Sequence, residues 1–361
     1  PLGIAHFLEH KMFEQEDGVD PFTYFSESGT DVNASTSFDN TQYICYGTKK
    51  FNDNLRYLLR FVNNPYYTDQ NVEKEKGIIA EEIKMYDDIP DFKLEMKLRE
   101  NIYKNSPRRI DIAGTVAEIT KITKEDLYNC YENFYIPNNM FILIVGNFNP
   151  DRALNTIKEE LEYKQFRELP KIKDIKEPKL VNVKEETFTE NIQVPKIALG
   201  LKVPLKESSL SDFELDLYLN MLTTILFGAS SEFREQVRSE KILNSIYLEW
   251  ESIPNIKVFY FMATTQKPDQ LLNEIKERFK NISITESTFN RIKKVWIANE
   301  VKMIDSINAT VNNTFDDIIR YGSIIPNKVD IIRKMKVNVL RDLIKQIDFS
   351  TLSIIKMLNN D

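Results

Sequence analysis

Cysteine is scarce in this chain: only Cys45 and Cys130 occur among 361 residues. Small secreted domains that cannot build a large core depend on several disulfides, and two cysteines cannot supply such a framework. Cys45 lies in an apolar run typical of a strand, whereas Cys130 lies in an aromatic-rich segment typical of a helix. We therefore expect two buried thiols, and nothing in the sequence demands an oxidising compartment.

Long hydrophobic runs and an excess of basic residues are missing too. No apolar stretch approaches the roughly 18 residues of a membrane-spanning helix. The 48 Lys and Arg are outnumbered by 55 Asp and Glu, which gives a net charge of −7. Nucleic-acid binders usually carry a basic stripe that neutralises phosphates. We therefore expect a soluble, cytoplasmic protein that binds neither nucleic acid nor a membrane.

Histidine is equally rare, and both copies, His6 and His10, lie within five residues with Glu9 between them. Helical residues four apart lie one turn apart on the same face, so both imidazoles can bind one ion. Neutral imidazole is a good zinc ligand, and a catalytic zinc site leaves one position open to water. The order His-x-x-Glu-His is the inverted zinc-peptidase signature, with Glu9 as the base. The competing interpretation is an ordinary helix with two histidines on its polar edge.

A third ligand is expected in the glutamate-rich segment 73–86, which has helical periodicity. Glu75 and Glu82 lie about two turns apart and share a face with apolar side chains, whereas Glu81 points to solvent. A carboxylate on an apolar face needs a partner, because an unpaired buried charge is costly. We predict that Glu82 is the third zinc ligand and that Glu75 orients a ligand or the bound water. The alternative is a solvated helix whose glutamates pair with lysines.

These residues resemble the pitrilysin and insulysin family of zinc peptidases, which includes the mitochondrial processing peptidase. In that family, a later helix carries a glutamate that is preceded by another acidic residue seven positions earlier, as Glu82 is by Glu75. The resemblance covers nearly the whole chain and is greatest to small bacterial processing-peptidase-like members that work in pairs. Further segments similar to the family are Gly3–Phe13, Asn33–Ser37 with Thr41 and Tyr43, Asp111–Thr115, and Phe134–Met140 running into Val145–Gly146.

The predicted fold class is α+β, with two homologous domains that each form a mainly antiparallel sheet with helices packed on one face. We expect a zinc-binding catalytic domain at 1–165, a linker at 166–180 and a second domain without metal at 181–361. Family members carry further strands before the motif helix, so we expect the first sheet to lack those upstream strands.

Periodicity predicts the individual elements. Helices are predicted at 51–64, 70–87, 91–104, 123–135, 208–227, 268–281, 286–306, 309–321 and 327–346. Strands are predicted at 41–47, 140–146, 181–193, 195–203, 245–251, 256–264 and 350–357.

The resemblance also implies where a peptide substrate binds. An extended peptide would add beside residues 31–38, because backbone hydrogen bonds hold many sequences without reading their side chains. Asn33 and Ala34 are the contacts that match the family. For Asn33, a turn residue bonded to its own backbone is an equal alternative.

In the second half, many family members place an arginine and a tyrosine seven residues apart near the substrate. Arg238 matches the arginine, but Ser245 stands at the tyrosine position and Tyr247 lies two residues further on. We keep Arg238 and Tyr247 as candidate substrate contacts, although an ordinary surface residue of a helix is the simpler interpretation of Arg238. A homologous partner subunit, in a heterodimer or a homodimer, would then supply the missing contacts.

The resemblance implies a zinc-dependent endopeptidase that hydrolyses short unstructured or leader-type peptides, with zinc-bound water as nucleophile and Glu9 as general base. The alternative is a non-catalytic peptide-binding or scaffolding subunit of a heterodimeric processing peptidase. A complete set of His6, Glu9, His10 and Glu82 argues against that alternative. A purely structural zinc site is a third interpretation, disfavoured because two histidines and one glutamate leave a position open.

Overall fold

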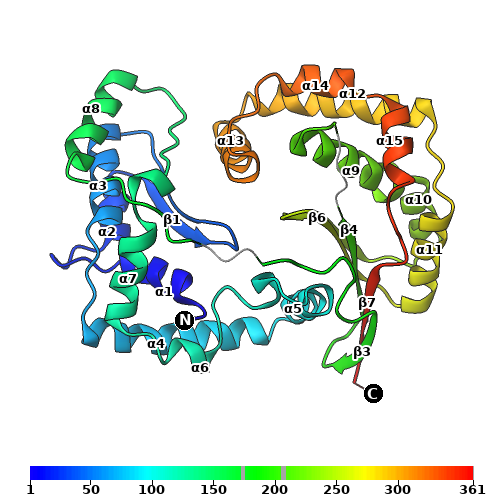
Figure 1. The fold of residues 1–361 in the computed structure, drawn as a ribbon, viewed down its shortest axis with the longest axis horizontal. Helices are drawn as coiled ribbons and strands as arrows, with labels where there is room; N and C mark the ends of the chain where they lie inside the picture. The colour runs from blue at the N-terminus through cyan, green and yellow to red at the C-terminus, as the bar shows by residue number, and fades with distance from the viewer. Residues whose placement is uncertain (172–174, 205–208, 361) are drawn as a thin grey trace. The chain divides into compact units, whose positions relative to one another are not determined.

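The computed structural model describes residues 1–171, 175–204 and 209–360 (Figure 1). The chain forms two compact units: the first contains Pro1–Asp88 and Ile110–Asp174, and the second contains Ile89–Arg109 and Ile175–Asp361. Helices and mainly antiparallel sheets make up both, so the predicted α+β class is confirmed. Part of the predicted linker, 172–174, and the first residue of the predicted helix 208–227 lie outside the described residues.

The first unit consists mainly of helices and contains one β-hairpin. Strands β1 (Asp31–Thr36) and β2 (Thr41–Tyr46) pair antiparallel, with Thr36 opposite Thr41. The helices are α1 (Ile4–Met12), α2 (Pro21–Ser26), α3 (Phe51–Asn63), α4 (Asp69–Asp87), α6 (Val116–Ile119), α7 (Lys124–Phe134) and α8 (Pro150–Leu161), with a 3₁₀ turn at Pro137–Asn139. Helices α2, α6 and α8 were not predicted.

Local interactions fix the residues at which α4 and α1 begin. Helix α4 begins at a capping box, in which Thr68 and Asn71 each bond the other's backbone N–H. Before α1, Gly3 adopts φ 81°, and a Cβ there would lie 2.3 Å from the carbonyl oxygen of Ala113. Only glycine fits this left-handed conformation without strain, so the start of α1 is held against the Ala113 loop.

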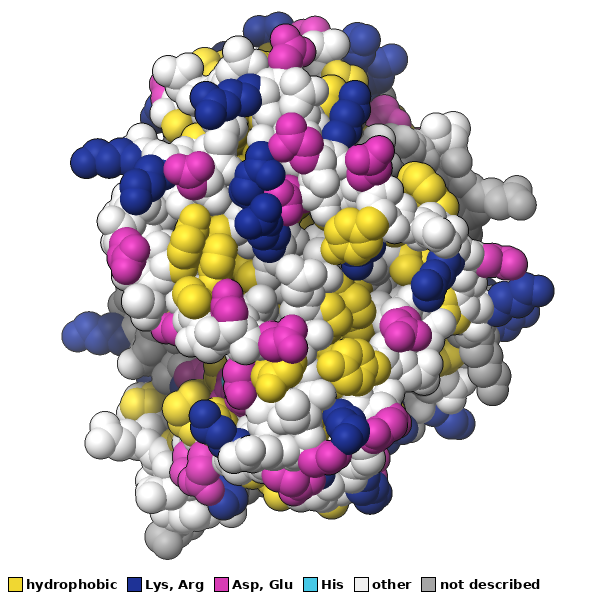
Figure 2. Space-filling view, turned by 90° about the vertical axis from the view of Figure 1, so that its left-hand side faces the viewer, with side chains coloured by type: hydrophobic (Ala, Val, Ile, Leu, Met, Phe, Trp, Pro, Cys, Tyr) yellow, Lys and Arg dark blue, Asp and Glu magenta, His cyan; other side chains and the backbone are white. Residues whose placement is uncertain are grey.

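The surface of the first unit mixes both signs of charge. Figure 2 shows the face on the left of Figure 1, where basic and acidic side chains are interspersed. Apolar side chains also reach this unit's surface; Phe22, Ile78 and Met85 are each about half exposed. Cys45 and Cys130 are unpaired, as predicted, but only partly buried. Burial raises the pKa of the Cys45 thiol to about 11.

The second unit is built on a five-stranded sheet in the order β3-β7-β4-β6-β5. All pairs are antiparallel except β3 with β7, which are parallel. The strands are β3 (Glu185–Glu190), β4 (Lys196–Pro204), β5 (Ser245–Ile253), β6 (Ile256–Thr264) and β7 (Leu352–Asn359). Strand β6 has the predicted bounds, because its continuous apolar run, buried on both faces, is easily distinguished.

Most helices of this unit cover one face of the sheet and form its larger core. They are α9 (Asp212–Phe227), α10 (Glu232–Ser239), α11 (Pro268–Lys280), α12 (Glu286–Met303), α14 (Lys328–Lys334) and α15 (Val337–Ile344). Helix α13 (Ile307–Tyr321) belongs to the same unit but contributes no residue to this core cluster. The predicted helix 327–346 is two helices, because Lys336 adopts an extended conformation between α14 and α15. Helix α10 was predicted only through the helical position of Arg238, without bounds.

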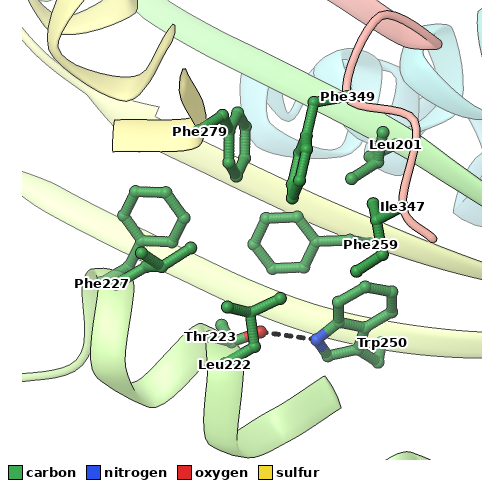
Figure 3. A pocket seen from close by; sticks show the side chains of 10 residues that line it. Leu201, Leu222, Thr223, Phe227, Trp250, Phe259, Phe279, Ile347 and Phe349 are labelled. Atoms are coloured by element: carbon green, nitrogen blue, oxygen red, sulfur yellow. Dashed lines mark hydrogen bonds between the residues drawn. The ribbon is translucent and has the colours of Figure 1, made fainter. Parts of the chain in front are cut away.

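The interior beneath these helices is tightly filled. Aromatic rings of Phe227, Phe259 and Phe279 meet there, and the Trp250 indole donates a 2.6 Å hydrogen bond to the Thr223 hydroxyl (Figure 3). The remaining cavity of about 10 Å³ holds at most one water. This region is therefore packed core and not a binding site.

Helix α5 (Pro90–Ile102) covers the opposite face of the same sheet, where Leu94, Leu98 and Ile102 join a second core cluster. Segment Ile89–Arg109 therefore packs with the second unit, whereas the sequence had assigned it to the domain at 1–165. The physical reason is that its apolar face is buried by β-strands far away in the sequence. The expectation of helices on a single face is incomplete for this unit.

The predicted strand at 140–146 is wrong, since these residues have no regular structure. Phe141 and Ile142 are each 43% exposed. A strand needs a neighbour to take its backbone hydrogen bonds, and in the described part of the first unit residues 140–146 pair with neither strand of the β1–β2 hairpin.

We expect Leu98→Ala to destabilise the second unit by about 2–5 kcal/mol, because it leaves a cavity under α5 where Leu98 is fully buried. Both tryptophans, Trp250 and Trp296, belong to this unit, so denaturant unfolding followed by their fluorescence measures its stability. Glu100→Ala, on the exposed side of α5, should change the stability by less than about 0.5 kcal/mol. Equal midpoints for the two variants would contradict this placement of α5.

Candidate metal centre

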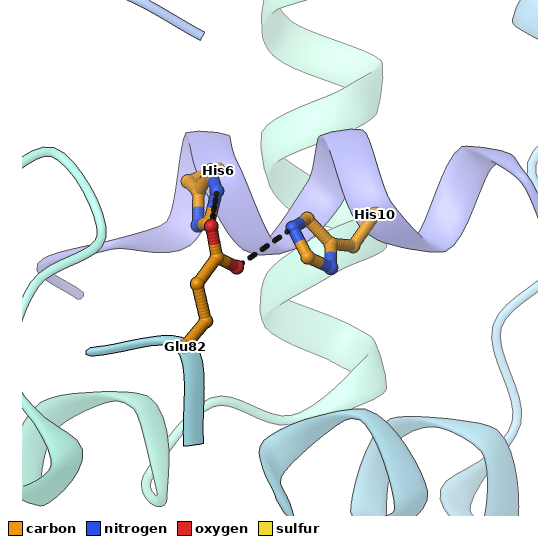
Figure 4. A group of neighbouring side chains, drawn as sticks. All are labelled: His6, His10 and Glu82. Carbon is orange, nitrogen blue, oxygen red and sulfur yellow. Dashed lines mark ion pairs between the residues drawn. The ribbon is translucent and has the colours of Figure 1, made fainter. Parts of the chain in front are cut away.

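Helices α1 and α4 bring three potential ligands together (Figure 4). His6 and His10 project from successive turns of α1, and Glu82 reaches them from α4. Glu82 Oε1 lies 3.8 Å from His6 Nε2, and Glu82 Oε2 lies 3.3 Å from His10 Nε2. One ligand atom from each residue lies within 4.8 Å of the other two. Two imidazoles and a carboxylate are the donor set of several catalytic zinc sites.

Glu75 fixes the orientation of the His10 ring, because its Oε1 lies 3.1 Å from His10 Nδ1. A proton on Nδ1 leaves Nε2 as the free lone pair, facing Glu82. Burial opposes the charged form of His10, but the hydrogen bond to Glu75 and the nearby carboxylate charges of Glu75, Glu82 and Glu9 together outweigh it and raise the His10 pKa. Burial also disfavours the Glu75 carboxylate, yet the bonds from His10 and Lys11 hold its pKa below the usual value.

His6 is held in its neutral form. Burial, helped by the neighbouring His10, lowers the His6 pKa to about 4. Its Nδ1 is buried without a hydrogen-bond partner, while its Nε2 faces Glu82. Because metal ions bind the deprotonated nitrogen, a buried neutral imidazole of this kind fits a zinc ligand.

Glu9 lies on the same helix between the histidines and is 8% exposed. The hydroxyl of Thr36 donates a hydrogen bond to its carboxylate. Burial raises the pKa of Glu9, and the Thr36 bond offsets part of this rise. A carboxylate with a raised pKa beside a metal centre is suited to accept and return a proton.

A chain of hydroxyl groups extends from Glu9 into the hairpin. Thr36 lies 3.2 Å from Thr41 on the partner strand, and the Tyr43 and Tyr135 hydroxyls are 2.9 Å apart. Tyr43 also packs against the aromatic rings of Phe13 and Phe61. The role of Thr36 beside Glu9 was missed by sequence reasoning. The alternation of β1, in which Thr36 faces inward, was the available signal.

The other predicted substrate residues are Asn33 in the first unit and Arg238 and Tyr247 in the second unit. Asn33 is exposed on β1, and its side chain accepts a hydrogen bond from the N–H of Ala34, which is the local bonding considered as the alternative. In the second unit, Arg238 is exposed on α10. Tyr247 is half exposed on β5, where its hydroxyl donates to Glu249 at 2.7 Å. Their substrate roles stay predictions.

Comparisons with known proteins match both halves of the chain. Residues 1–116 match the family model described as Insulinase (Peptidase family M16), and residues 121–295 match the Peptidase M16 inactive domain. A curated relative, the uncharacterized zinc protease YmfH of Bacillus subtilis, is 37% identical over 355 residues, which cover 95% of this chain and 80% of that protein. The chain belongs to peptidase family M16. The resemblance that the sequence indicated is confirmed.

Solved structures agree with this assignment to family M16. The crystal structure of a putative M16-like peptidase from Alicyclobacillus acidocaldarius matches with a TM-score of 0.91 and 31% identity, over 99% of this chain and 86% of that one. A further relative, named non-peptidase homolog YmxG in Helicobacter pylori, is 20% identical over 95% of this chain and 81% of that protein.

Among the described residues, no helix is long and apolar enough to cross a membrane.

We expect Glu82→Gln to weaken zinc binding by at least about tenfold, because groups that merely support ligands already contribute that much. Glu81→Gln is the matched control, since Glu81 is the adjacent residue on α4 with its side chain 75% exposed. Zinc per chain, measured by elemental analysis after dialysis, and the zinc dissociation constant should change only for Glu82→Gln. Equal losses in both variants would assign the ligand to the wrong glutamate.

Proposed function

We propose that this chain is a zinc-dependent endopeptidase that hydrolyses short unstructured or leader-type peptides. One observation carries the proposal: the imidazoles of His6 and His10 converge with the Glu82 carboxylate, and Glu9 lies beside them without belonging to the set. Membership of family M16 and a relative named as a zinc protease support the same reaction.

The residues divide into ligands and a proton carrier. His6, His10 and Glu82 would hold the ion, which when bound supplies a Lewis acid that polarises the scissile carbonyl and acidifies a water. Glu9 would accept a proton from that water and return it to the leaving amine. Its buried carboxylate, kept in place by the Thr36 hydroxyl, needs no covalent bond to the substrate.

Strand β1 supports the proposed mode of peptide binding. Among the described residues it pairs only with β2, so its other edge is available for a peptide that adds as a further strand. Thr36 belongs to β1 and also bonds Glu9, which connects that edge to the proton carrier. Ala34, a small partly buried residue on the same strand, is one of the proposed peptide contacts.

We also propose a homologous partner subunit, in a heterodimer or a homodimer, and a cytoplasmic location. The departure at Ser245 from the family's arginine–tyrosine spacing supports a partner that contributes contacts to the substrate. Two unpaired cysteines are consistent with a reducing compartment.

A non-catalytic peptide-binding or scaffolding subunit remains the second candidate. It is favoured by the relative named as a non-peptidase homolog and by the inactive-domain description that matches residues 121–295. The complete set of His6, Glu9, His10 and Glu82 favours catalysis, because a subunit that only binds peptides has no chemical need for Glu9.

We expect Glu9→Gln to lower kcat/KM for an unstructured Lys/Arg-rich fluorogenic peptide by about 10²–10⁴-fold while zinc content stays unchanged, because it removes the base and no ligand. Glu81→Gln, an exposed carboxylate removed in the same way, should retain full activity. Loss of zinc together with activity would contradict the role of Glu9. A zinc-loaded chain that cleaves nothing, alone or mixed with a homologous subunit, would establish the second candidate.

A further inference from the structure

Lys11 directly follows the second histidine of the motif, and its side chain is fully buried, with 0% of its surface exposed. Lysine is almost never buried completely, because its ammonium group loses a large hydration energy unless partners replace the water. A positive charge is also an unexpected neighbour for a site whose donor set fits a divalent cation. Lys11 is neither one of the three potential ligands nor the proposed proton carrier.

Two carboxylates compensate the buried ammonium. Lys11 Nζ donates to Glu14 Oε2 at 2.5 Å and to Glu75 Oε2 at 3.4 Å. The other oxygen of Glu75, Oε1, lies 3.1 Å from His10 Nδ1. Glu75 is therefore held at both oxygens, by Lys11 on one and by His10 on the other.

We propose that Lys11 is a positioning residue of the metal centre, which acts on the ion only through Glu75. Held by Lys11, the Glu75 carboxylate cannot rotate away from His10, so it keeps the proton on His10 Nδ1 and directs Nε2 toward Glu82. Without Lys11, Glu75 loses one of its two anchors and the His10 ring loses its fixed orientation. This inference rests on the zinc site of the proposed function but not on catalysis.

The direction in which zinc affinity changes when Lys11 is removed distinguishes a positioning role from a purely electrostatic one. An ammonium near a divalent cation repels it, so a Lys11 that acted only as a charge would weaken zinc binding, and its removal would strengthen it. A Lys11 that positions Glu75 has the opposite effect, because its removal weakens zinc binding.

The first test is Lys11→Met, which replaces the lysine with an unbranched side chain one heavy atom shorter and removes its charge. We expect the zinc dissociation constant, measured by competition with a chromogenic chelator, to rise by about 10–100-fold, the usual effect of losing a group that supports a ligand. Lys84→Met is the matched control: it removes an exposed lysine two residues from Glu82 on α4, and its affinity should stay within about threefold of the unaltered chain.

The second test is a double-mutant cycle with Glu75→Gln. If Lys11 acts only through Glu75, Lys11→Met causes no further loss of zinc affinity in the Glu75→Gln background. Zinc binding that is unchanged or tighter in Lys11→Met, or losses that add in the double variant, would overturn the proposal.

Folding and the zinc site itself are controlled separately. The thermal unfolding midpoint of each metal-free variant shows whether it is folded, and if Lys11→Met is not, the same cycle is run with Lys11→Gln, whose amide also lacks the charge. Absence of zinc binding by the unaltered chain would overturn the proposed function together with this inference. Normal zinc binding by the unaltered chain with no effect at Lys11 would overturn this inference alone.

Discussion

The packing of α1 against α4 is the interaction on which the metal centre depends. Phe7 and Leu8 of α1 share one apolar cluster with Ile79 and Ile83 of α4. On each helix these side chains lie next to the polar residues of the site, so burying them brings the imidazoles to the carboxylates. The hydrophobic contact supplies the stability, since aligning unpaired buried charges by themselves would cost free energy.

Burial then determines the electrostatics of the centre. Glu9 and Glu75 are equally buried, each 8% exposed, yet their pKa values shift in opposite directions. Glu75 is bonded by a histidine and a lysine, whereas Glu9 is bonded by a neutral hydroxyl. Two carboxylates in one site thus acquire different properties from their partners, one suited to orient a ligand and the other to carry a proton.

In the second unit, too, the bonding partners of a buried carboxylate determine its properties, although this carboxylate belongs to the core. The buried carboxylate of Glu251 accepts hydrogen bonds from Arg99, Arg108 and the hydroxyl groups of Tyr103 and Tyr260. These contacts join α5 and the turn after it to β5 and β6. They explain why the chain leaves the first unit directly after the helix of Glu82 and returns to it at Ile110. No metal ligand is needed here, because two guanidinium groups already balance the carboxylate.

The sequence by itself determined the main features that depend on helical or strand spacing. It placed His6 and His10 on one face, separated Glu82 from the exposed Glu81, and located the buried strands of the second sheet. Only the tertiary structure decided that Lys11 meets Glu75, 64 residues away, and that Thr36 meets Glu9, 27 residues away. It also decided that α5 belongs to the second unit and that residues 140–146 form no strand. Spacing fixes the direction in which a side chain leaves its own element, whereas the element that covers it is chosen by packing between distant segments.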